Sequence, residues 1–540
     1  MDTVVQHILV LRRCRLSLQG LGQILHTPMA FCQQEYRNIM TLTAPATTPP
    51  TLSHPRGIWV LALTEMWERF TYYGMRALLV LFLVSKVSDG GFALDDHTAA
   101  AIYGLYTAGI YLMAVPGGWI ADRLIGARNA IMAGGVLITA GNLILGIAPS
   151  STLFCGGLLV IALGVGLLKP NVSAIVGSLY PEGGARRDAG FSLFYMGINA
   201  GGFLGPIVAG LVAQYANRRW GFIAGAFFMI CGVAQFWLSR RHLGTAGASP
   251  RDAKGAECPV RFGSDWYPML IGTGALALLA IALGTGFIPV TATGLSHYAA
   301  WLIVATAIGY FGYLLLLANL TSVERGRFVV ILLLFASSAV FWSGFEQAGS
   351  SLNLFAERYT DRMISALHWE MPAELLQSWN SLFVIMFAPI FSWLWVMLAR
   401  HQLNPSAPLK FAFGLLLMGL GFLVMVGAAQ VVVRGGHPLP SWLIATYLLH
   451  TFGELALSPV GLSFITKLAP QRFVGQAMGL WFLSTSLGNL IAGIAAGQFS
   501  ADNIAAFPDQ FFQVFVLGAV GAVVLVLLAR PAQKLMAGVE

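Results

Sequence analysis

Residues 58–84 read IWVLALTEMWERFTYYGMRALLVLFLV, an apolar run long enough to cross a membrane that nevertheless carries charged side chains. The charged residues of this run are Glu65, Glu68, Arg69 and Arg76, with Tyr72 and Tyr73 between them. At about 100° per residue, all six fall within roughly 140° of a helix. The run therefore predicts a membrane helix with one polar face, on which opposite charges can neutralise one another.

This polar face is too long to be explained as a helix end at the membrane surface. Glu65 alone could snorkel to the interface, but Arg76 lies ~16 Å further along the helix. An ionisable group at the centre of a membrane helix costs at least ~2.5–3.5 kcal/mol. We therefore expect the face to meet partner charges or to line a water-filled pathway.

The composition of the whole chain is that of a membrane protein. Of 540 residues, 57% are hydrophobic and 10% are charged, whereas soluble proteins have about a quarter of their residues charged. The formal net charge is +8, but the basic residues lie in short loops between apolar runs. This pattern favours the lipid bilayer as partner and argues against nucleic acid. The cysteines Cys14, Cys32, Cys155, Cys231 and Cys258 have neither metal-ligand spacing nor a disulfide framework, and we predict no metal.

Apolar runs of about 20 residues recur along the chain and predict an all-α polytopic membrane protein. Fourteen membrane helices are expected, at residues 58–84, 99–121, 129–148, 153–176, 190–214, 220–239, 266–287, 297–320, 328–352, 376–399, 409–430, 441–466, 474–497 and 511–530.

Lysine and arginine are unequally divided between alternate loops. With the N-terminus inside, the inner loops hold seventeen: Arg123, Arg128, Arg186, Arg187, Arg240, Arg241, Arg251, Lys254, Arg261, Arg325, Arg327, Arg400, Lys410, Lys467, Arg472, Arg530 and Lys534. The outer loops hold six: Lys86, Arg218, Arg219, Arg358, Arg362 and Arg434. The positive-inside rule then predicts that both termini are cytoplasmic.

Two segments lie outside the predicted spans. Residues 1–54 combine a mildly apolar, arginine-containing start with a Thr/Pro-rich stretch. A signal or transit peptide is one interpretation, but we expect a disordered tail, upstream of a start at Met40. Residues 240–265 form the longest polar, basic stretch of the interior and predict a cytoplasmic linker.

Three further spans carry single charges, namely Lys169, Glu346 and Glu454. With the first span, this places four acids and three bases in the bilayer. Such near-balance suggests mutual neutralisation with one acid left to gain and lose a proton, as in a proton-coupled switch. Static salt bridges that hold the helices together are the alternative. His450, one turn before Glu454, is expected to pack or hydrogen-bond, because one His–Glu pair lacks the ligands for a metal.

These motifs resemble the proton-dependent oligopeptide transporters of the major facilitator superfamily. The resemblance runs from about residue 54 to the C-terminus, through HPRGIWVLALTEMWERFTYYGMRALLVLFL, GGWIADRLIGARNAI, GVGLLKPNVS, FSLFYMGINAGGFLGP, FWSGFEQAGSSLNLFAERYTDR and GELALSPVGLSFITKLAP. It implies the major facilitator fold, with six-helix bundles at 55–239 and 328–540 and a linker with two inserted helices at 240–327.

The resemblance also implies a binding site for short peptides. Arg76 would bind the substrate carboxylate, which suits a guanidinium fork, and Glu454 would receive the free ammonium. The other substrate residues would be Arg69, Tyr72, Tyr73, Tyr111, Lys169, Asn199, Trp342, Asn380 and Trp481. For the aromatic residues, ordinary helix packing stays an alternative.

Proton coupling is implied for Glu65, Glu68, Arg69 and Glu346. Glu346 would pair with Arg76 on the outer side and Lys169 with Glu454 on the inner side, so that protonation shifts the population between two packings. The loop after the second span resembles the superfamily's hinge motif at Gly118, Asp122, Gly126 and Arg128. No cofactor beyond the proton is implied, and we expect a monomer in a bacterial inner membrane.

Two positions depart from the family pattern. The second span lacks the titratable histidine of some members, and Ser381 stands where a proline is common. One alternative keeps the fold but changes the cargo to an amino acid, a modified peptide or an anion. A remote alternative is a membrane enzyme with a metal at Asp95 and Asp96, although adjacent acids before a helix are more often a cap.

Overall fold

The structure is a computed structural model, which describes residues 54–180, 184–250, 266–285, 287, 289–499 and 501–539. The predictions for the N-terminal tail up to residue 53, and for the linker between residues 251 and 265, lie outside these residues. The part of the chain from Pro55 to Glu540 forms one compact unit.

Each of the fourteen predicted spans is a long helix in the described part of the chain. These helices are α3 (Arg56–Val84), α4 (Asp96–Ile120), α5 (Ala127–Ile147), α6 (Ser151–Ser178), α7 (Gly184–Tyr215), α8 (Arg218–Ser239), α9 (Tyr267–Gly284), α10 (Ala292–Leu316), α11 (Ser322–Phe345), α13 (Ser378–Arg400), α14 (Ala407–Val433), α15 (Ser441–Leu468), α16 (Val474–Gly497) and α17 (Phe507–Met536). Within the described ranges, twelve helical segments are long and apolar enough to span a membrane. The other two are α3, which carries the charged face, and α9, whose apolar part is short. The predicted all-α polytopic fold is confirmed.

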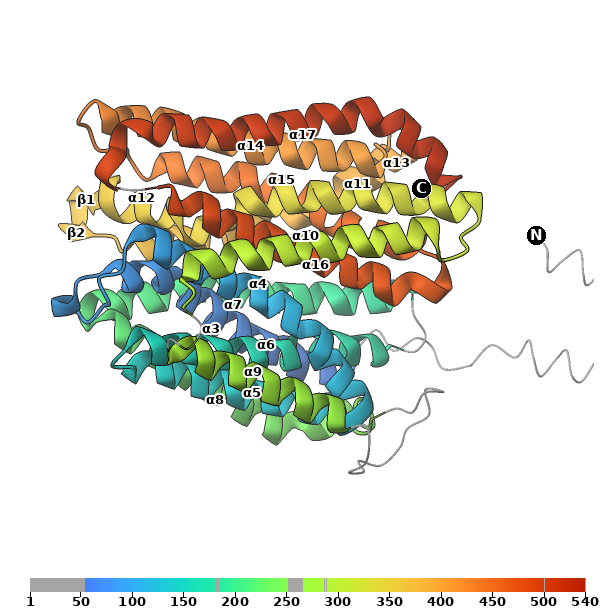
Figure 1. The fold of residues 1–540 in the computed structure, drawn as a ribbon, viewed down its shortest axis with the longest axis horizontal. Helices are drawn as coiled ribbons and strands as arrows, with labels where there is room; N and C mark the ends of the chain where they lie inside the picture. The colour runs from blue at the N-terminus through green and yellow to red at the C-terminus, as the bar shows by residue number, and fades with distance from the viewer. Residues whose placement is uncertain are drawn as a thin grey trace, which may run out of the picture. The chain divides into compact units, whose positions relative to one another are not determined.

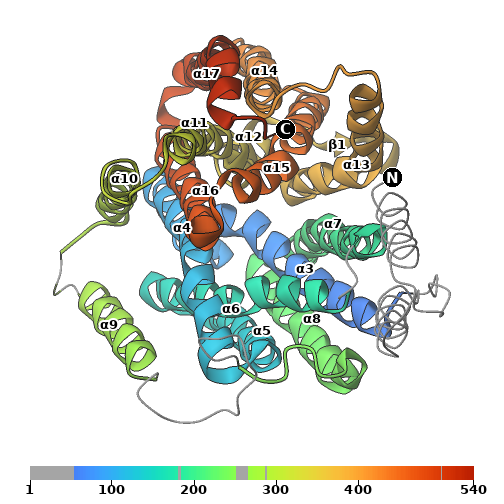
Figure 2. The same ribbon diagram turned by 90° about the vertical axis from the view of Figure 1, so that its right-hand side faces the viewer.

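The helices pack in two groups, which Figure 2 shows nearly end-on. In the N-terminal half, α3 to α8, helix α3 packs against α7 and α8, and α5 packs against α6. In the C-terminal half, α11 to α17, helix α14 packs against α15 and α17, and α11 packs against α16. The predicted bundle boundaries stay a prediction.

In the described part of the chain, the two most extensive contacts between the halves are those of α4 with α16 and of α7 with α13. The first crossing is close because glycines face each other: a Cβ on Gly104 would lie 3.1 Å from the Cα of Gly493. The second crossing brings Ser381 of α13 against Gly202 of α7, where a Cβ would collide with the serine hydroxyl. The unusual Ser381 therefore lies buried at a contact between the halves.

The inserted helices differ in their packing. Helix α10 packs against α4 of one half and against α16 and α11 of the other, and the hydroxyl of Tyr310 donates a hydrogen bond to Gln476 of α16. By contrast, no residue of α9 whose burial is described is buried. In a bilayer, such a helix exposes its apolar side chains to lipid.

Short elements gather at one end of the helices, at the left of Figure 1. They are α12 (Ser351–Tyr359), the antiparallel strands β1 (Met363–Ile364) and β2 (Trp369–Glu370), and the 3-10 helix η7 (Ala373–Gln377). This end, which also holds the α3–α4 connection, is called the α12 end below. The C-terminus lies at the opposite end.

Candidate functional site

The predicted polar face of α3 is buried. Arg69 pairs with both acids: its Nε lies 3.3 Å from Glu65 Oε1 and close to Glu68, and its Nη2 donates to Glu68 Oε1 at 2.7 Å. The guanidinium also lies 5.0 Å from the ring centre of Tyr72. One cation thus neutralises two carboxylates on the same helix. The pair with Glu65 follows from the four-residue spacing, which places both residues on one face, whereas Glu68 is the adjacent residue and its pair with Arg69 does not follow from that spacing.

Further along the same face, Arg76 reaches the other half of the molecule. Its Nη2 lies 3.2 Å from Oε2 of Glu346 at the start of the 3-10 helix η5 (Glu346–Gly349). Its Nε donates to the hydroxyl of Tyr103 on α4 at 2.8 Å. This hydroxyl is also 3.2 Å from both Oε2 and the main-chain oxygen of Glu346. The structure therefore joins the predicted pair, Arg76 and Glu346, both directly and through the hydroxyl of Tyr103.

Glu454 lies on α15 beside a polar group of the same half. Asn380 of α13 donates through Nδ2 to Thr451 Oγ1 at 2.9 Å and to Glu454 Oε2 at 3.2 Å. Asn380 directly precedes Ser381, which lies against Gly202 of α7. The predicted residues Asn380 and Glu454 are thus brought together, close to the contact of α13 with α7 of the other half.

The predicted Lys169–Glu454 pair is not formed in this conformation. The ammonium of Lys169 lies 4.6 Å from the ring centre of Tyr111, and among the described residues it makes no ion pair. Tyr111 in turn lines a cavity of about 310 Å³ between α4, α10 and α16. The inserted helix α10 therefore closes one side of the space next to a predicted substrate residue.

The remaining predicted substrate residues are buried among helix contacts. Asn199 donates to the carbonyl of Tyr195 in its own helix. The indole of Trp481 packs over Gly461 and near Phe411, while Trp342 packs beside Phe341 and Phe345. The Trp342 Nε1 has no hydrogen-bond partner among the described residues. The contacts of Trp481 are those of ordinary helix packing. Trp342 differs, because its indole N–H is left without a hydrogen-bond acceptor among the described residues.

His450 does not form a site with Glu454. Its Nε2 lies 3.1 Å from the carbonyl oxygen of Met418, and its ring lies beside Phe422. The packing and hydrogen-bonding role expected from the sequence is therefore what the structure shows.

The hinge motif lies where α4 passes through a π-helical turn, η2 (Ala121–Ile125), into α5. Gly126 has φ 81° and ψ 150°, values open essentially only to glycine. Arg128 donates to the carbonyls of Ala246 (2.7 Å) and Gly244 (2.5 Å) beyond α8. Asp122 and Gly118 are not buried. The motif thus fixes the α4–α5 connection to the chain segment that follows the N-terminal half.

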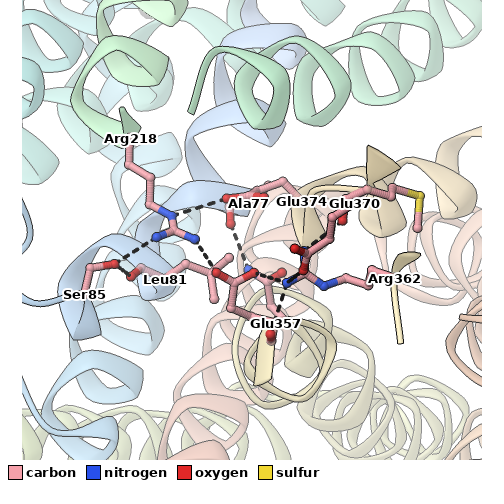
Figure 3. A network of polar contacts seen from close by, with 10 residues as sticks. Ala77, Leu81, Ser85, Arg218, Glu357, Arg362, Glu370 and Glu374 are labelled. Carbon is pink, nitrogen blue, oxygen red and sulfur yellow. Dashed lines mark hydrogen bonds and ion pairs between the residues drawn. The ribbon is translucent and has the colours of Figure 1, made fainter. Parts of the chain in front are cut away.

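At the α12 end, charged residues tie the two halves together, as Figure 3 shows. Arg218 of α8 donates to Ser85 at the end of α3 (3.0 Å) and to Glu357 of α12 (2.6 Å), and its Nε lies 3.5 Å from Glu374 of η7. Glu357 also pairs with Arg362 at 3.1 Å. A cavity of about 300 Å³ lies among these side chains. We call Arg218, Glu357, Arg362, Glu370 and Glu374 the α12-end network.

A second tie at this end uses the acids considered for the enzyme alternative. Both carboxylate oxygens of Asp96 accept hydrogen bonds from Arg358, at 2.7 and 2.8 Å. Asp95 caps α4 by accepting from the main-chain N–H of Thr98 at 2.9 Å and from its hydroxyl at 2.8 Å. Both carboxylates are thus engaged in structural contacts, as the capping interpretation predicted for Asp95.

Sequence reasoning missed Tyr103, Asp96, Arg358 and the α12-end network as contacts between the halves. For Tyr103 a signal existed: Tyr103, Tyr106 and Tyr111 lie on one side of α4 at offsets of three and eight residues. For the outer charges no local signal existed, because loop charges are usually solvated.

A family model described as the POT family matches residues 128–257 and 297–511 of this chain. A peptide transporter of Yersinia enterocolitica subsp. palearctica is 40% identical over 498 residues, which cover 89% of this chain and 95% of that protein. A di-/tripeptide transporter of Lactococcus lactis subsp. lactis is 34% identical, covering 90% of this chain and 97% of that protein.

Solved structures with the same fold include a variant of a peptide transporter crystallised with alafosfalin. It superposes with a TM-score of 0.81 at 37% identity, covering 91% of this chain and 97% of that one. A second, a POT family transporter in complex with 5-aminolevulinic acid, has a TM-score of 0.79 at 32% identity, covering 89% of this chain and 98% of that one.

Proposed function

Because this chain belongs to the POT family, we propose that it imports di- and tripeptides together with protons, by alternating access. Membership of this family makes the chain a membrane transporter rather than an enzyme. Relatives that are named peptide and di-/tripeptide transporters support the choice of cargo. The proton would be the coupling ion, and no other cofactor is proposed.

One observation carries the proposal: opposite charges from the two halves face the same interior. Arg76 lies buried on α3 of the N-terminal half, and Glu454 lies half-buried on α15 of the C-terminal half. A zwitterion with separated ends suits such a pair, because the guanidinium fork binds a carboxylate and the glutamate binds an ammonium. The other predicted substrate residues would then surround the peptide backbone and side chains. They are Tyr72, Tyr73, Tyr111, Lys169, Asn199, Asn380, Trp342 and Trp481.

The proton would act on the ion pairs that join the halves. When Glu346 takes up a proton, Arg76 loses its counter-charge and becomes free for the peptide carboxylate. Glu65 and Glu68 share Arg69 and would exchange protons in the same cycle. A proton thereby changes which packing of the halves has its charges satisfied.

We assign the α12 end to the outside of a bacterial inner membrane and both termini to the cytoplasm, following the distribution of lysine and arginine. In the described conformation the outer ends are tied by ion pairs, while Lys169 and Glu454 are apart. This is the arrangement of an inward-facing state. The transporter would work as a monomer, with the hinge motif at Gly118, Asp122, Gly126 and Arg128 guiding the inner ends.

Uptake of labelled dialanine into proteoliposomes tests the function. An inward proton gradient should drive accumulation, and Glu454→Gln should reduce uptake at least tenfold, the order expected for losing a charged partner of the ammonium. Glu370→Gln, the same change at a half-exposed outer residue, serves as the control. Absence of uptake for every di- and tripeptide tried, at any gradient, would reject the proposal.

A second cargo class is favoured by one observation, the solved relative in complex with 5-aminolevulinic acid. Competition distinguishes the two: unlabelled 5-aminolevulinic acid should displace dialanine weakly if peptides are the main cargo. Strong displacement, combined with dialanine uptake that survives Glu454→Gln, would indicate a different small zwitterion.

A further inference from the structure

The hydroxyl of Tyr103 lies at the centre of the contact between the two halves. It accepts a hydrogen bond from Arg76 Nε at 2.8 Å. It lies 3.2 Å from two oxygens of Glu346, the carboxylate Oε2 and the main-chain carbonyl. All three side chains are buried. Because a hydroxyl carries one proton, it fully donates to only one of the two Glu346 oxygens at a time.

The position of this hydroxyl is restricted from a second side. Gly349 ends the 3-10 turn that begins with Glu346, and a Cβ on Gly349 would collide with the Tyr103 hydroxyl. The turn that carries the carboxylate therefore closes directly over the phenol. Any side chain at position 349 would move the hydroxyl away from its present partners.

The guanidinium of Arg76 is held by one edge only. Its Nε is bonded to Tyr103, whereas Nη2, although 3.2 Å from Glu346 Oε2, makes no hydrogen bond within the described residues. The Nη2 edge is thus attracted by the carboxylate but geometrically unsatisfied. A ligand carboxylate that approaches this edge would gain a directed hydrogen bond that Glu346 does not make.

We propose that Tyr103 is a positioning residue that keeps Arg76 in its substrate-binding orientation after Glu346 has taken up a proton. The inference rests on the proposed function. While Glu346 is ionised, the tyrosine proton points to Oε2. Once Glu346 is neutral, the hydroxyl turns its proton to the main-chain carbonyl at the same distance and still accepts from Nε. Arg76 then loses its ion pair but keeps its orientation.

Other charged or titratable groups lie within electrostatic range of Glu346. They come from every element that faces it: Arg76, Tyr72 and Tyr73 of α3, Tyr103 and Tyr111 of α4, Lys169 of α6 and Glu454 of α15. Among the described residues, only Tyr103 and Arg76 form a hydrogen bond or an ion pair with the Glu346 carboxylate. Removing the Tyr103 hydroxyl changes no net charge in this group, so an effect of that change reports on geometry.

Peptide binding by the purified protein tests the inference without any need for a proton gradient. Isothermal titration with dialanine should give a Kd about tenfold weaker for Tyr103→Phe, as expected for one hydrogen bond to a charged group. Gly349→Ala should weaken binding in the same direction, because it displaces the hydroxyl while keeping it. Tyr106→Phe is the matched control, since the buried Tyr106 hydroxyl has no partner among the described residues.

The decisive comparison uses Glu346→Gln, which mimics the neutral carboxyl. Adding Tyr103→Phe to this variant should again weaken dialanine binding about tenfold, because the proposed role belongs to the protonated state. Loss of the effect in this background would overturn the inference, as would an unchanged Kd in both Tyr103→Phe and Gly349→Ala. If Tyr103→Phe does not fold, Gly349→Ala decides alone. A wild-type protein that binds no peptide would reject the proposed function itself, and this inference with it.

Discussion

Gly126 shows how a single residue can be fixed by backbone geometry rather than by a side-chain contact. Its φ of 81° and ψ of 150° place it in a region that other residues occupy only at a cost of about 1–3 kcal/mol. A Cβ there would also lie 3.0 Å from the carbonyl oxygen of Ala248. Gly118, in the same motif, has ordinary helical geometry, and its nearest neighbour would be 4.0 Å from a Cβ.

The two glycines of the motif should therefore respond differently to the same change. Gly126→Ala should lower the unfolding free energy by about 1–3 kcal/mol, whereas Gly118→Ala should leave it nearly unchanged or raise it slightly. Thermal unfolding of the purified protein measures both. Equal stability of the two variants would mean that the strained geometry of Gly126 is not part of the folded state.

At the scale of elements, the crossing of α4 and α16 closes the α12 end. A Cβ on Gly493 would lie 2.7 Å from the carbonyl oxygen of Ala100 and 2.8 Å from the Cα of Gly104. Main chain cannot yield as a flexible side chain does, so a methyl group must push the helices apart. Ser486 of α16 donates to the carbonyl of Ala108 at 3.0 Å and depends on the same approach.

Gly493→Ala should accordingly weaken the closed outer contact and lower stability by roughly 1–3 kcal/mol, the usual cost of overpacking. Gly479→Ala, in the same helix with nothing within 4 Å of its Cβ position, is the control. Thermal unfolding measures the loss of stability, and dialanine uptake measures the effect of the weaker outer contact on transport. Wild-type behaviour of Gly493→Ala would show that α4 and α16 tolerate a wider separation.

At the scale of the whole molecule, the α12-end network decides how firmly the outer ends of the halves are held. Glu357 is its central acid, because it pairs with Arg218 of the N-terminal half and with Arg362 of its own half. Among the described residues, the Glu370 side chain forms an ion pair only with Arg362, and it is 55% exposed. The tie between the halves therefore depends on Glu357 rather than on Glu370.

Glu357→Gln should raise the fraction of outward-facing molecules about two- to fivefold, the size expected for a partly exposed ion pair. The same change at Glu370 should have little effect. Labelling of Ala77→Cys, a buried position of α3 near the network in Figure 3, by a membrane-impermeant maleimide measures this fraction. If the Glu357→Gln and Glu370→Gln variants are both labelled to the same extent as the protein with neither change, the ion pairs at the outer end do not control opening.

Much of this architecture could be predicted from the chain. Helix periodicity and hydropathy act over neighbouring residues, so the fourteen helices and the charged face of α3 were predictable. The pairing of Arg69 with Glu65 followed from the four-residue spacing within one helix. The pairing of Arg76 with Glu346 followed only from the family resemblance, because these residues lie far apart in the chain.

The sequence by itself determined which ionisable groups enter the bilayer, since the cost of burying a charge and the 3.6-residue repeat are local properties. Only the tertiary structure decided which groups meet. Tyr103 joins Arg76 to Glu346, and Arg218 reaches Glu357, because helices from distant parts of the chain cross at these points. The crossing depends on how glycines such as Gly104 and Gly493 let the main chains approach, and no stretch of sequence specifies both partners of such a contact.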